Sequence, residues 1–403
     1  MNRRNFLRLA VGSGAAAVSW RLWAAPTGGS NSRFVLVFLR GAYDSLSALV
    51  PYSEPFYYEA RPGIAIARPD PASLDAAIAL DGRWAMHPAM DDALLPFWDA
   101  GQLAFVPFSG TGFVSRSHFQ AQDWVEFGQA PGERPDTRSG FLNRLLLELG
   151  GSSSRQSGVS FTQSLPPVMR GKVQVANSPV RLSTKRQVGV GYENLLLAMY
   201  DKHALEGLVR EGLGLRREIS KELQEEMQTA SRGALPAGGF ALEAERIGRL
   251  MHDHPQYSVG FVDIGGWDTH VGQGAARGPL ANRLQGLSAG LKAMAEALGP
   301  EWQKTTVVVM SEFGRTFREN GSRGTDHGHG STMWIMGGGL KGGKIIGEQS
   351  GLAQKDLHQD RDVPVLNEYR EVLGGIFARQ YGLDKSALAS VFPGAAPRDF
   401  GLL

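Results

Sequence analysis

The apolar run Thr305–Ser311 is the sequence feature that most restricts the fold, because its β-branched residues predict a strand buried on both faces. Glu312 follows at once, and Asp326, His327 and His329 then crowd into four residues between glycines. Acidic and imidazole groups beyond a strand are suitable ligands for a divalent metal. The stretch therefore predicts a buried strand that leads into a metal-binding loop. The alternative is a polar loop whose histidines hydrogen-bond neighbouring strands.

The rest of the chain alternates between strand-like and helix-like patterns. Further apolar runs predict strands at Arg33–Arg40, Leu103–Phe108, Ser258–Ile264 and Met333–Met336. Helical patterns cover Met86–Ala100, His118–Phe127, Leu280–Leu298 and Asn367–Tyr381, whereas Pro51–Asp81 reads as irregular surface. This alternation predicts an α/β fold, with a mostly parallel central sheet and helices on both faces.

Polar side chains follow four of the predicted strands, just beyond the end of each. They are Asp44, then Ser115 and Ser117, then Asp268 and His270, and finally Glu312. In open α/β sheets, functional groups collect beyond the carboxyl ends of the strands. The repeated placement therefore favours a functional site at one edge of the sheet over four unrelated capping residues.

Ser117 stands where a Gly-containing turn enters the predicted helix His118–Phe127. Serine is an ordinary N-cap residue, so a purely structural role is one interpretation. The other is a nucleophile, because a helix N-terminus supports a hydroxyl and the anionic group that it attacks.

Two segments lie outside this pattern. Residues 150–237 open with a Gly/Ser-rich loop and contain a charged helical stretch, Glu193–Thr229, so we interpret them as an insertion or cap on a single domain spanning 30–400. Residues 1–25 carry paired arginines, Arg3 and Arg4, then Phe-Leu and a Gly/Ala-rich segment, which resembles a twin-arginine export signal. We therefore expect a periplasmic or secreted protein.

Composition excludes several function classes. The chain of 403 residues has no cysteine, which removes disulfides, thiol nucleophiles and thiolate metal sites. Removing residues 1–25 takes away four arginines and no acid, so the formal net charge changes from +2 to −2. The sequence therefore has no basic patch that would indicate nucleic-acid binding. The export segment is too short and interrupted to span a membrane well, and no other span is expected.

Four motifs resemble the DUF1501 family of exported bacterial proteins. They are GAYDSLSALVPY (41–52), SRSHFQAQDW (115–124), GGWDTH (265–270) and SEFGRTFRENGSRGTDHGHG (311–330). The resemblance spans nearly all of the mature chain, and the last motif is highly specific. The family in turn resembles the alkaline phosphatase–sulfatase superfamily in its order of strands and sites.

The resemblance implies a role for each matching residue. In that superfamily a first-strand Asp, a nucleophile at a helix start, an Asp…His pair, an Asp-His pair and a final His bind two metals. The matching residues here are Asp44, Ser117 or Ser115, Asp268 with His270, Glu312, and His327 or His329.

Phe313 departs from the superfamily pattern, because it occupies the position of the His in the Asp-His pair and cannot ligate. One of the two metals is then lost, or rebuilt with Asp326, His118 or the spare histidine. The absence of cysteine, and of a proline in Ser115–Ser117, also argues against formylglycine sulfatase chemistry.

The resulting hypothesis is a metal-dependent hydrolase of phosphate-type esters, with one or two zinc or manganese ions and a small-molecule or polymer substrate. The metal would activate the serine hydroxyl or water, and Arg315 or Arg116 would hold the anionic transition state. The competing hypothesis is a non-catalytic binding or assembly protein with a degenerate metal site, which Phe313 favours.

The export interpretation generates the first testable prediction. Replacing Arg3 and Arg4 together by lysine should leave the precursor in the cytoplasm, because a receptor-read signal distinguishes the two cations. Cell fractionation followed by immunoblotting measures the distribution. Normal periplasmic accumulation of the double variant would contradict the assignment.

Overall fold

A ten-stranded sheet organises the computed structural model, which describes residues 32–132, 136–150, 157–178 and 228–403. Its strands are β1 (Arg33–Leu39), β5 (Leu103–Gly110), β6 (Ser157–Ser160), β7 (Ala176–Asn177), β8 (Leu235–Pro236), β9 (Tyr257–Gly265), β10 (Thr305–Ser311), β11 (Ser331–Met336), β12 (Lys344–Ile345) and β13 (Asn367–Glu368). Their order is β12-β5-β11-β10-β1-β9-β6-β7, with β13 beside β5 and β8 beside β9. A smaller sheet joins β2 (Leu49–Val50), β4 (Ala85–Met86) and β3 (Ile78–Ala79).

Most neighbouring strands of the large sheet are parallel. β1 lies between β9 and β10 and runs parallel to both, and all seven of its residues are buried. β11 is antiparallel to both β10 and β5. The strands therefore have the near-continuous apolar character of a sheet covered on both faces.

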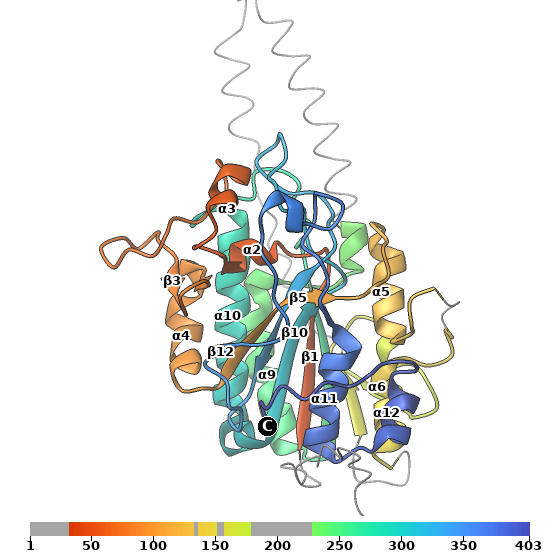
Figure 1. Cartoon of the computed structure of the whole chain (residues 1–403). Helices are drawn as coiled ribbons and strands as arrows, with labels where there is room; N and C mark the ends of the chain where they lie inside the picture. The colour runs from red at the N-terminus through yellow and green to blue at the C-terminus, as the bar shows by residue number, and fades with distance from the viewer. Residues whose placement is uncertain (1–31, 133–135, 151–156, 179–227) are drawn as a thin grey trace, which may run out of the picture.

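Helices cover both faces of this sheet. The α-helices are α2 (Ser45–Ala48), α3 (Pro55–Ala60), α4 (Asp91–Asp99), α5 (His118–Phe127), α6 (Phe141–Glu148), α9 (Phe240–Asp253), α10 (Pro279–Leu298), α11 (Tyr369–Tyr381) and α12 (Lys385–Val391). Short 3-10 helices are η1 (Pro88–Met90), η3 (Pro167–Met169), η4 (Ala237–Gly239), η5 (Gly299–Lys304) and η6 (Gln354–Asp356). Figure 1 shows α4 and α10 on one side of the sheet and α6, α11 and α12 on the other.

Alternation along β1 divides the core into two layers. Val35 and Val37 pack in the layer that contains α4, α9 and α10, whereas Phe34 and Leu36 pack in the layer that contains α6, α11 and α12. Successive side chains of a strand point to opposite faces, so one apolar strand supports both layers. The predicted fold class, a mostly parallel α/β sheet with helices on both faces, is confirmed.

The predicted elements differ from the observed ones mainly at their boundaries. Met86–Ala100 is not one helix: β4 ends at Met86, and η1 precedes α4, which begins only at Asp91. Pro88 lacks the backbone N–H needed inside a helix and therefore suits the start of η1. Asn367 pairs in β13 before α11 begins, and Pro51–Asp81 contains the short helix α3.

One edge of the sheet receives polar loops from five strands. The parallel strands β1, β9 and β10 have their carboxyl ends at this edge. β5 has the same direction, because it is antiparallel to β11, which is itself antiparallel to β10. β11 runs the other way, so the loop that precedes it, residues 326–330, arrives at the same edge as the loops that follow the others. This topology brings the four motifs together.

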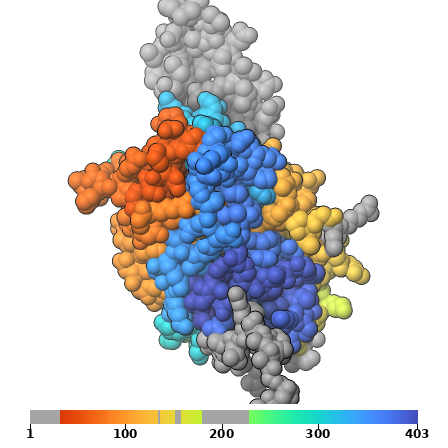
Figure 2. Space-filling model, in the orientation of Figure 1, coloured from red at the N-terminus to blue at the C-terminus, as the bar shows by residue number. Residues whose placement is uncertain are grey.

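Segments far apart in sequence meet on the face shown in Figure 2, where the red and orange atoms of the described N-terminal residues lie beside the blue atoms of residues near 350. The Trp84 indole donates to the Gln349 side chain at 2.8 Å across this junction. Most of the predicted helical stretch Glu193–Thr229 lies outside the described residues. Within the described part of the chain, no helix has the length and hydropathy needed to cross a membrane.

Candidate metal centre

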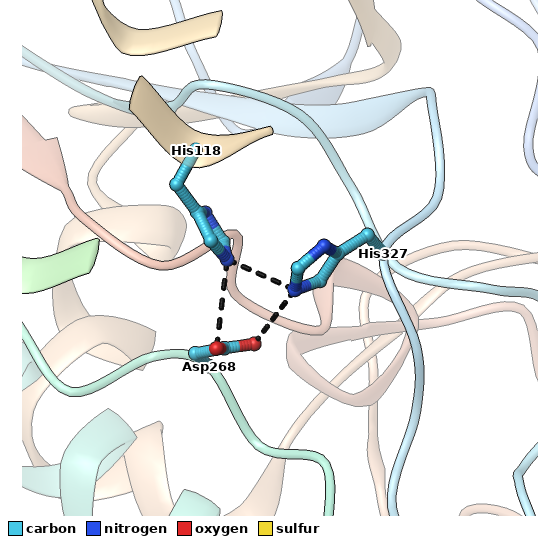
Figure 3. A group of neighbouring side chains, drawn as sticks. All are labelled: His118, Asp268 and His327. Atoms are coloured by element: carbon cyan, nitrogen blue, oxygen red, sulfur yellow. Dashed lines mark hydrogen bonds and ion pairs between the residues drawn. The ribbon is translucent and has the colours of Figure 1, made fainter. Parts of the chain in front are cut away.

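Four side chains from three loops converge at the polar edge of the sheet. His118 is the first residue of α5, which β5 reaches through residues 111–117. Asp268 and His270 follow β9, and His327 lies in the loop before β11. Figure 3 shows the His118 and His327 rings pointing toward each other and toward the Asp268 carboxylate.

The three imidazoles present the same ring nitrogen to one point. His327 Nε2 lies 2.9 Å from His118 Nε2 and 3.0 Å from His270 Nε2. Asp268 Oδ1 lies 2.9 Å from His270 Nε2 and 3.2 Å from His327 Nε2, and Asp268 Oδ2 lies 3.5 Å from His118 Nε2. His118, Asp268 and His327 form a group of side chains with metal-ligand spacing.

The opposite nitrogen of each ring faces an acceptor. His118 Nδ1 contacts Glu312 Oε1 at 2.8 Å and His270 Nδ1 contacts Asp326 Oδ1 at 3.1 Å. His327 Nδ1 contacts the backbone carbonyl of Arg116 at 2.8 Å. A carbonyl or ionised carboxylate can only accept, so these contacts place a proton on each Nδ1. A neutral ring then directs its Nε2 lone pair at the centre.

A divalent cation fits this donor set. Three neutral imidazoles with inward lone pairs, together with one carboxylate, need either added protons or a cation at the centre. Three carboxylates, those of Asp268, Glu312 and Asp326, stand against one guanidinium, that of Arg315, which leaves two negative charges. Histidine ligands held by outer carboxylates or carbonyls are the usual arrangement at protein metal sites.

Protons partly replace a cation when none is bound. Burial would lower the pKa of His118, but hydrogen bonds and charges from Asp268 and Glu312 outweigh it and raise the pKa to about 9. Burial would raise the pKa of Asp268, yet the three imidazoles and Arg315 hold it well below its usual value. Burial likewise opposes ionisation of Glu312, but His118 and Gln122 lower the Glu312 pKa to about 2.

Arg315 is buried against Asp268 and is not exposed to solvent. Its side chain is 0% exposed, and Nη1 lies 2.8 Å from Asp268 Oδ1. None of its three guanidinium nitrogens has a well-aligned hydrogen bond, so the contact is an ion pair by distance only. Burial lowers the Arg315 pKa, and Asp268 partly offsets this effect. Contrary to the sequence-based hypothesis, Arg315 is placed to neutralise Asp268 rather than to clamp an incoming substrate.

Asp44 has partners of its own. Arg61 donates to both of its carboxylate oxygens, at 2.6 and 3.0 Å, and Ser47 and Gln273 also donate to it. Burial opposes ionisation, but Arg61 lowers the Asp44 pKa below its usual value. The acid that the resemblance assigned to a metal is thus placed in a buried ion pair.

Two other predicted ligands lie one hydrogen bond away from the centre. Glu312 and Asp326 contact the outer nitrogens of His118 and His270 rather than the converging Nε2 atoms. Glu312 also accepts hydrogen bonds from the backbone of Gly41 and from the side chain of Gln122. Their role in this geometry is to orient the histidines.

His329 is separated from the cluster although it lies two residues from His327. Its ring packs against that of His358, with centroids 4.7 Å apart. Burial, followed by the charges of His358 and Arg116, lowers the His329 pKa to about 4. His118 takes the place expected for a further ligand, although the sequence gives it only a substitute role. Its position at a helix start just beyond a strand is the sequence feature that identifies it.

The candidate catalytic residues Ser115, Arg116 and Ser117 directly precede His118 at the start of α5. Ser117 is the exposed N-cap of α5, and its side chain makes no capping hydrogen bond. The Ser115 hydroxyl donates to Gln120 and accepts from the Ser117 backbone N–H. Arg116 is half-exposed, with Nη2 3.6 Å from Asp362, and its carbonyl holds His327.

Phe313 forms an apolar wall of the centre. Its ring stacks on His118 with centroids 5.0 Å apart and also contacts His327 at 5.4 Å. The residue that cannot ligate therefore restricts the orientations of two imidazoles that can.

A further serine motif has no catalytic context. Gly286–Gly290 has the Gly-x-Ser-x-Gly pattern, but Ser288 lies inside α10 and is 0% exposed. A nucleophile elbow requires a sharp turn between a strand and a helix. This pattern therefore reflects helix packing.

A family model described as "Protein of unknown function (DUF1501)" matches residues 31–392. The chain belongs to this family. The family predicted from the four motifs is thus confirmed, and no curated protein matches the chain.

Among solved structures, the chain is similar to a protein in the alkaline phosphatase superfamily from Vibrio parahaemolyticus (10% identity, TM-score 0.38, covering 77% of this chain and 61% of that one). It is also similar to the lipoteichoic acid synthase LtaP from Listeria monocytogenes (8%, 0.41, 88% and 73%). A third similar structure is a 2-O GAG sulfatase (10%, 0.42, 88% and 71%). At these TM-scores we infer nothing about activity from the similarity.

The His118 environment predicts a pH dependence of the metal-free protein. Its folded pKa of about 9 lies above the value of about 6.5 in unfolded chains, so its stabilising contribution is complete below pH 6.5 and is lost as pH rises through 9. The unfolding free energy of wild type relative to His118→Gln should therefore fall between pH 6.5 and 9, measured by denaturant titration with chelator present.

The matched control for that experiment is His329→Gln. The His329 pKa of about 4 predicts no protonation change above pH 6.5, so this variant should keep the wild-type slope in the same window. A constant difference between wild type and His118→Gln from pH 6.5 to 9 would contradict the assigned contacts.

The placement of Asp44 predicts that its loss affects stability rather than metal binding. Asp44→Asn should destabilise the protein by about 3–5 kcal/mol, because Arg61 would remain as a buried, uncompensated charge. The exposed Asp136–Arg138 pair is the control, and Asp136→Asn should cost less than about 1 kcal/mol. Unfolding titrations and metal analysis measure both effects. Loss of metal at unchanged stability would restore Asp44 as a ligand.

Proposed function

We propose that the chain is a metal-dependent hydrolase of phosphate or related esters. The observation that carries this proposal is the convergence of three imidazole Nε2 atoms and the Asp268 carboxylate on one point, with each ring held from outside by an acceptor. Such a geometry suits a bound cation, because neutral rings leave the inward lone pairs without a donor.

The residues that would hold the ion are His118, Asp268, His270 and His327, which is a mixed nitrogen and oxygen set without thiolate. Zinc or manganese suits such ligands, and the donor set supports one ion rather than two. When bound, a divalent ion lowers the pKa of a hydroxyl or water and polarises an ester oxygen.

Ser117 is the proposed nucleophile. It immediately precedes the ligand His118, is exposed, and has a hydroxyl that is not used as a helix cap. The N-terminus of α5 favours an anionic group beside it, and the half-exposed Arg116 offers a second anion contact. Ser115 is the weaker candidate, because its hydroxyl already bridges Gln120 and the Ser117 backbone.

The alternative is a non-catalytic metal-binding or assembly protein. Two observations favour it: Phe313 fills the place of a ligand and stacks on His118, and Asp44 is held by Arg61 instead of contributing to a second ion. This alternative keeps the metal and removes the hydrolysis, so metal content alone does not separate the two functions.

The proposed location of either function is outside the cytoplasm. This part of the proposal is supported by the Arg3–Arg4 motif alone. The lysine double variant described above tests it.

Two measurements on the same variants test the function. Protein purified without chelators should contain one equivalent of divalent metal by mass spectrometry, and Asp268→Ala with His270→Ala should abolish it. His252, which contacts the Leu298 carbonyl, provides the control: His252→Gln should retain full metal. Metal-free wild type would refute the centre.

Hydrolysis is then screened with activated phosphate mono- and diesters and sulfate esters, with zinc or manganese added. Ser117→Ala and Ser117→Gly should lower turnover by orders of magnitude at unchanged metal content, because both remove the nucleophile. Both should cost little stability, because the hydroxyl makes no capping bond. Ser115→Ala should retain more activity. Full metal occupancy without turnover of any ester would leave the binding protein as the function.

A further inference from the structure

A buried arginine lies behind the metal centre, separated from it by two side chains. Arg40 follows β1 and is 2% exposed. Its guanidinium donates to Asp263 at 2.6 Å, to Glu126 at 2.9 Å and to the Gln122 Oε1 atom at 2.9 Å. Burial alone would lower the Arg40 pKa, but Glu126 and Asp263 outweigh it and raise the pKa. Arg40 is therefore a permanent donor at this position.

This donor fixes the orientation of the Gln122 amide. A guanidinium has no acceptor, so the atom of Gln122 that faces Arg40 must be the carbonyl oxygen. The NH₂ group of Gln122 then faces Glu312 Oε1 at 3.0 Å and the Ala230 carbonyl at 2.8 Å. Both of those atoms accept, so the buried amide has no alternative orientation.

The amide in turn fixes the state of Glu312. Oε1 of Glu312 receives the Gln122 amide and the Gly41 backbone N–H, the latter at 2.9 Å. Two fixed donors on one oxygen of a 1% exposed carboxyl favour its ionised form. The third group on that oxygen, His118 Nδ1 at 2.8 Å, must then donate as well.

We propose that Gln122 is a positioning residue that transmits the donor polarity of Arg40 through Glu312 to His118, so that Nδ1 carries the proton and the Nε2 lone pair faces Asp268 and His327. The proposal deepens the metal-binding part of the proposed function and rests on it for its consequence. Hydrogen-bond partners of this kind behind a ligating histidine typically change metal affinity by about 10–100-fold.

Gln122→Met tests the relay, because methionine keeps the length of the side chain and removes its donors and acceptor. Gln380 supplies a matched control: it is 3% exposed and donates to the Arg33 carbonyl at the opposite end of β1. Gln380→Met therefore reproduces the loss of a buried amide away from the centre. Gln122→Glu is a second variant, which keeps an acceptor for Arg40 and removes the donor to Glu312.

The first readout needs neither metal nor activity. In chelated protein at alkaline pH, with the imidazole rings neutral, ¹⁵N spectra of labelled histidine report which ring nitrogen is protonated. His118→Gln identifies the resonance. Wild type and Gln380→Met should show His118 protonated at Nδ1. Gln122→Met and Gln122→Glu should show a mixture of both tautomers, because Glu312 loses the amide donor that holds its Oε1 toward Nδ1.

The second readout is zinc affinity by competition with a chromogenic chelator. Both Gln122 variants should bind zinc about 10–100-fold more weakly than wild type, and Gln380→Met should match wild type. Unchanged His118 tautomer and unchanged affinity in folded Gln122 variants would overturn the relay. If wild type binds no zinc, the proposed function fails, and the tautomer readout still decides the relay.

Discussion

The Asp268 carboxylate is the contact on which the rest of the site depends. It meets imidazoles from three separate loops and the buried guanidinium of Arg315. Such a concentration of charge in a buried place is tolerable only if each group has a partner of opposite sign. The imidazoles and Arg315 supply those partners, and the same arrangement favours occupation by a cation.

The antiparallel strand β11 makes this meeting possible. If β11 were parallel to β10, the loop 326–330 would leave from the opposite edge of the sheet, and His327 could not reach Asp268. The reversed strand also places Asp326 against His270. A single change of direction in a mostly parallel sheet therefore determines which residues form the centre.

The sequence predicts the sheet well, because a strand buried on both faces leaves a continuous apolar run. The observed bounds of β10 (Thr305–Ser311) and α5 (His118–Phe127) are the predicted ones. The sequence also places Asp268 and His270 beyond the end of a strand, whereas His327 reaches the same edge only because β11 is antiparallel, which the sequence does not show.

The sequence does not show which polar groups pair with one another. Arg61, 17 residues beyond Asp44, binds both oxygens of that carboxylate, and nothing in the spacing indicates this pairing. Likewise, the contact between Glu312 and His118 brings the start of α5 to the end of β10 and links residues 194 positions apart. The roles of Asp44 and Glu312, which depend on contacts between distant residues, are therefore visible only in the structure.

Glycines allow the loop after β10 and the loop before β11 to approach each other closely. A Cβ on Gly314 would lie 1.8 Å from the Gly330 carbonyl oxygen, and one on Gly328 would lie 2.4 Å from the backbone of Arg315. The loops are joined by backbone bonds from Gly314 to His329 and from Gly328 to Gly314, both 2.8 Å long. Because no side chain separates them, the loops bearing Glu312 and His327 are in direct backbone contact. Ligands on loops joined in this way would lose little conformational entropy on binding an ion, since their positions are already fixed by the backbone.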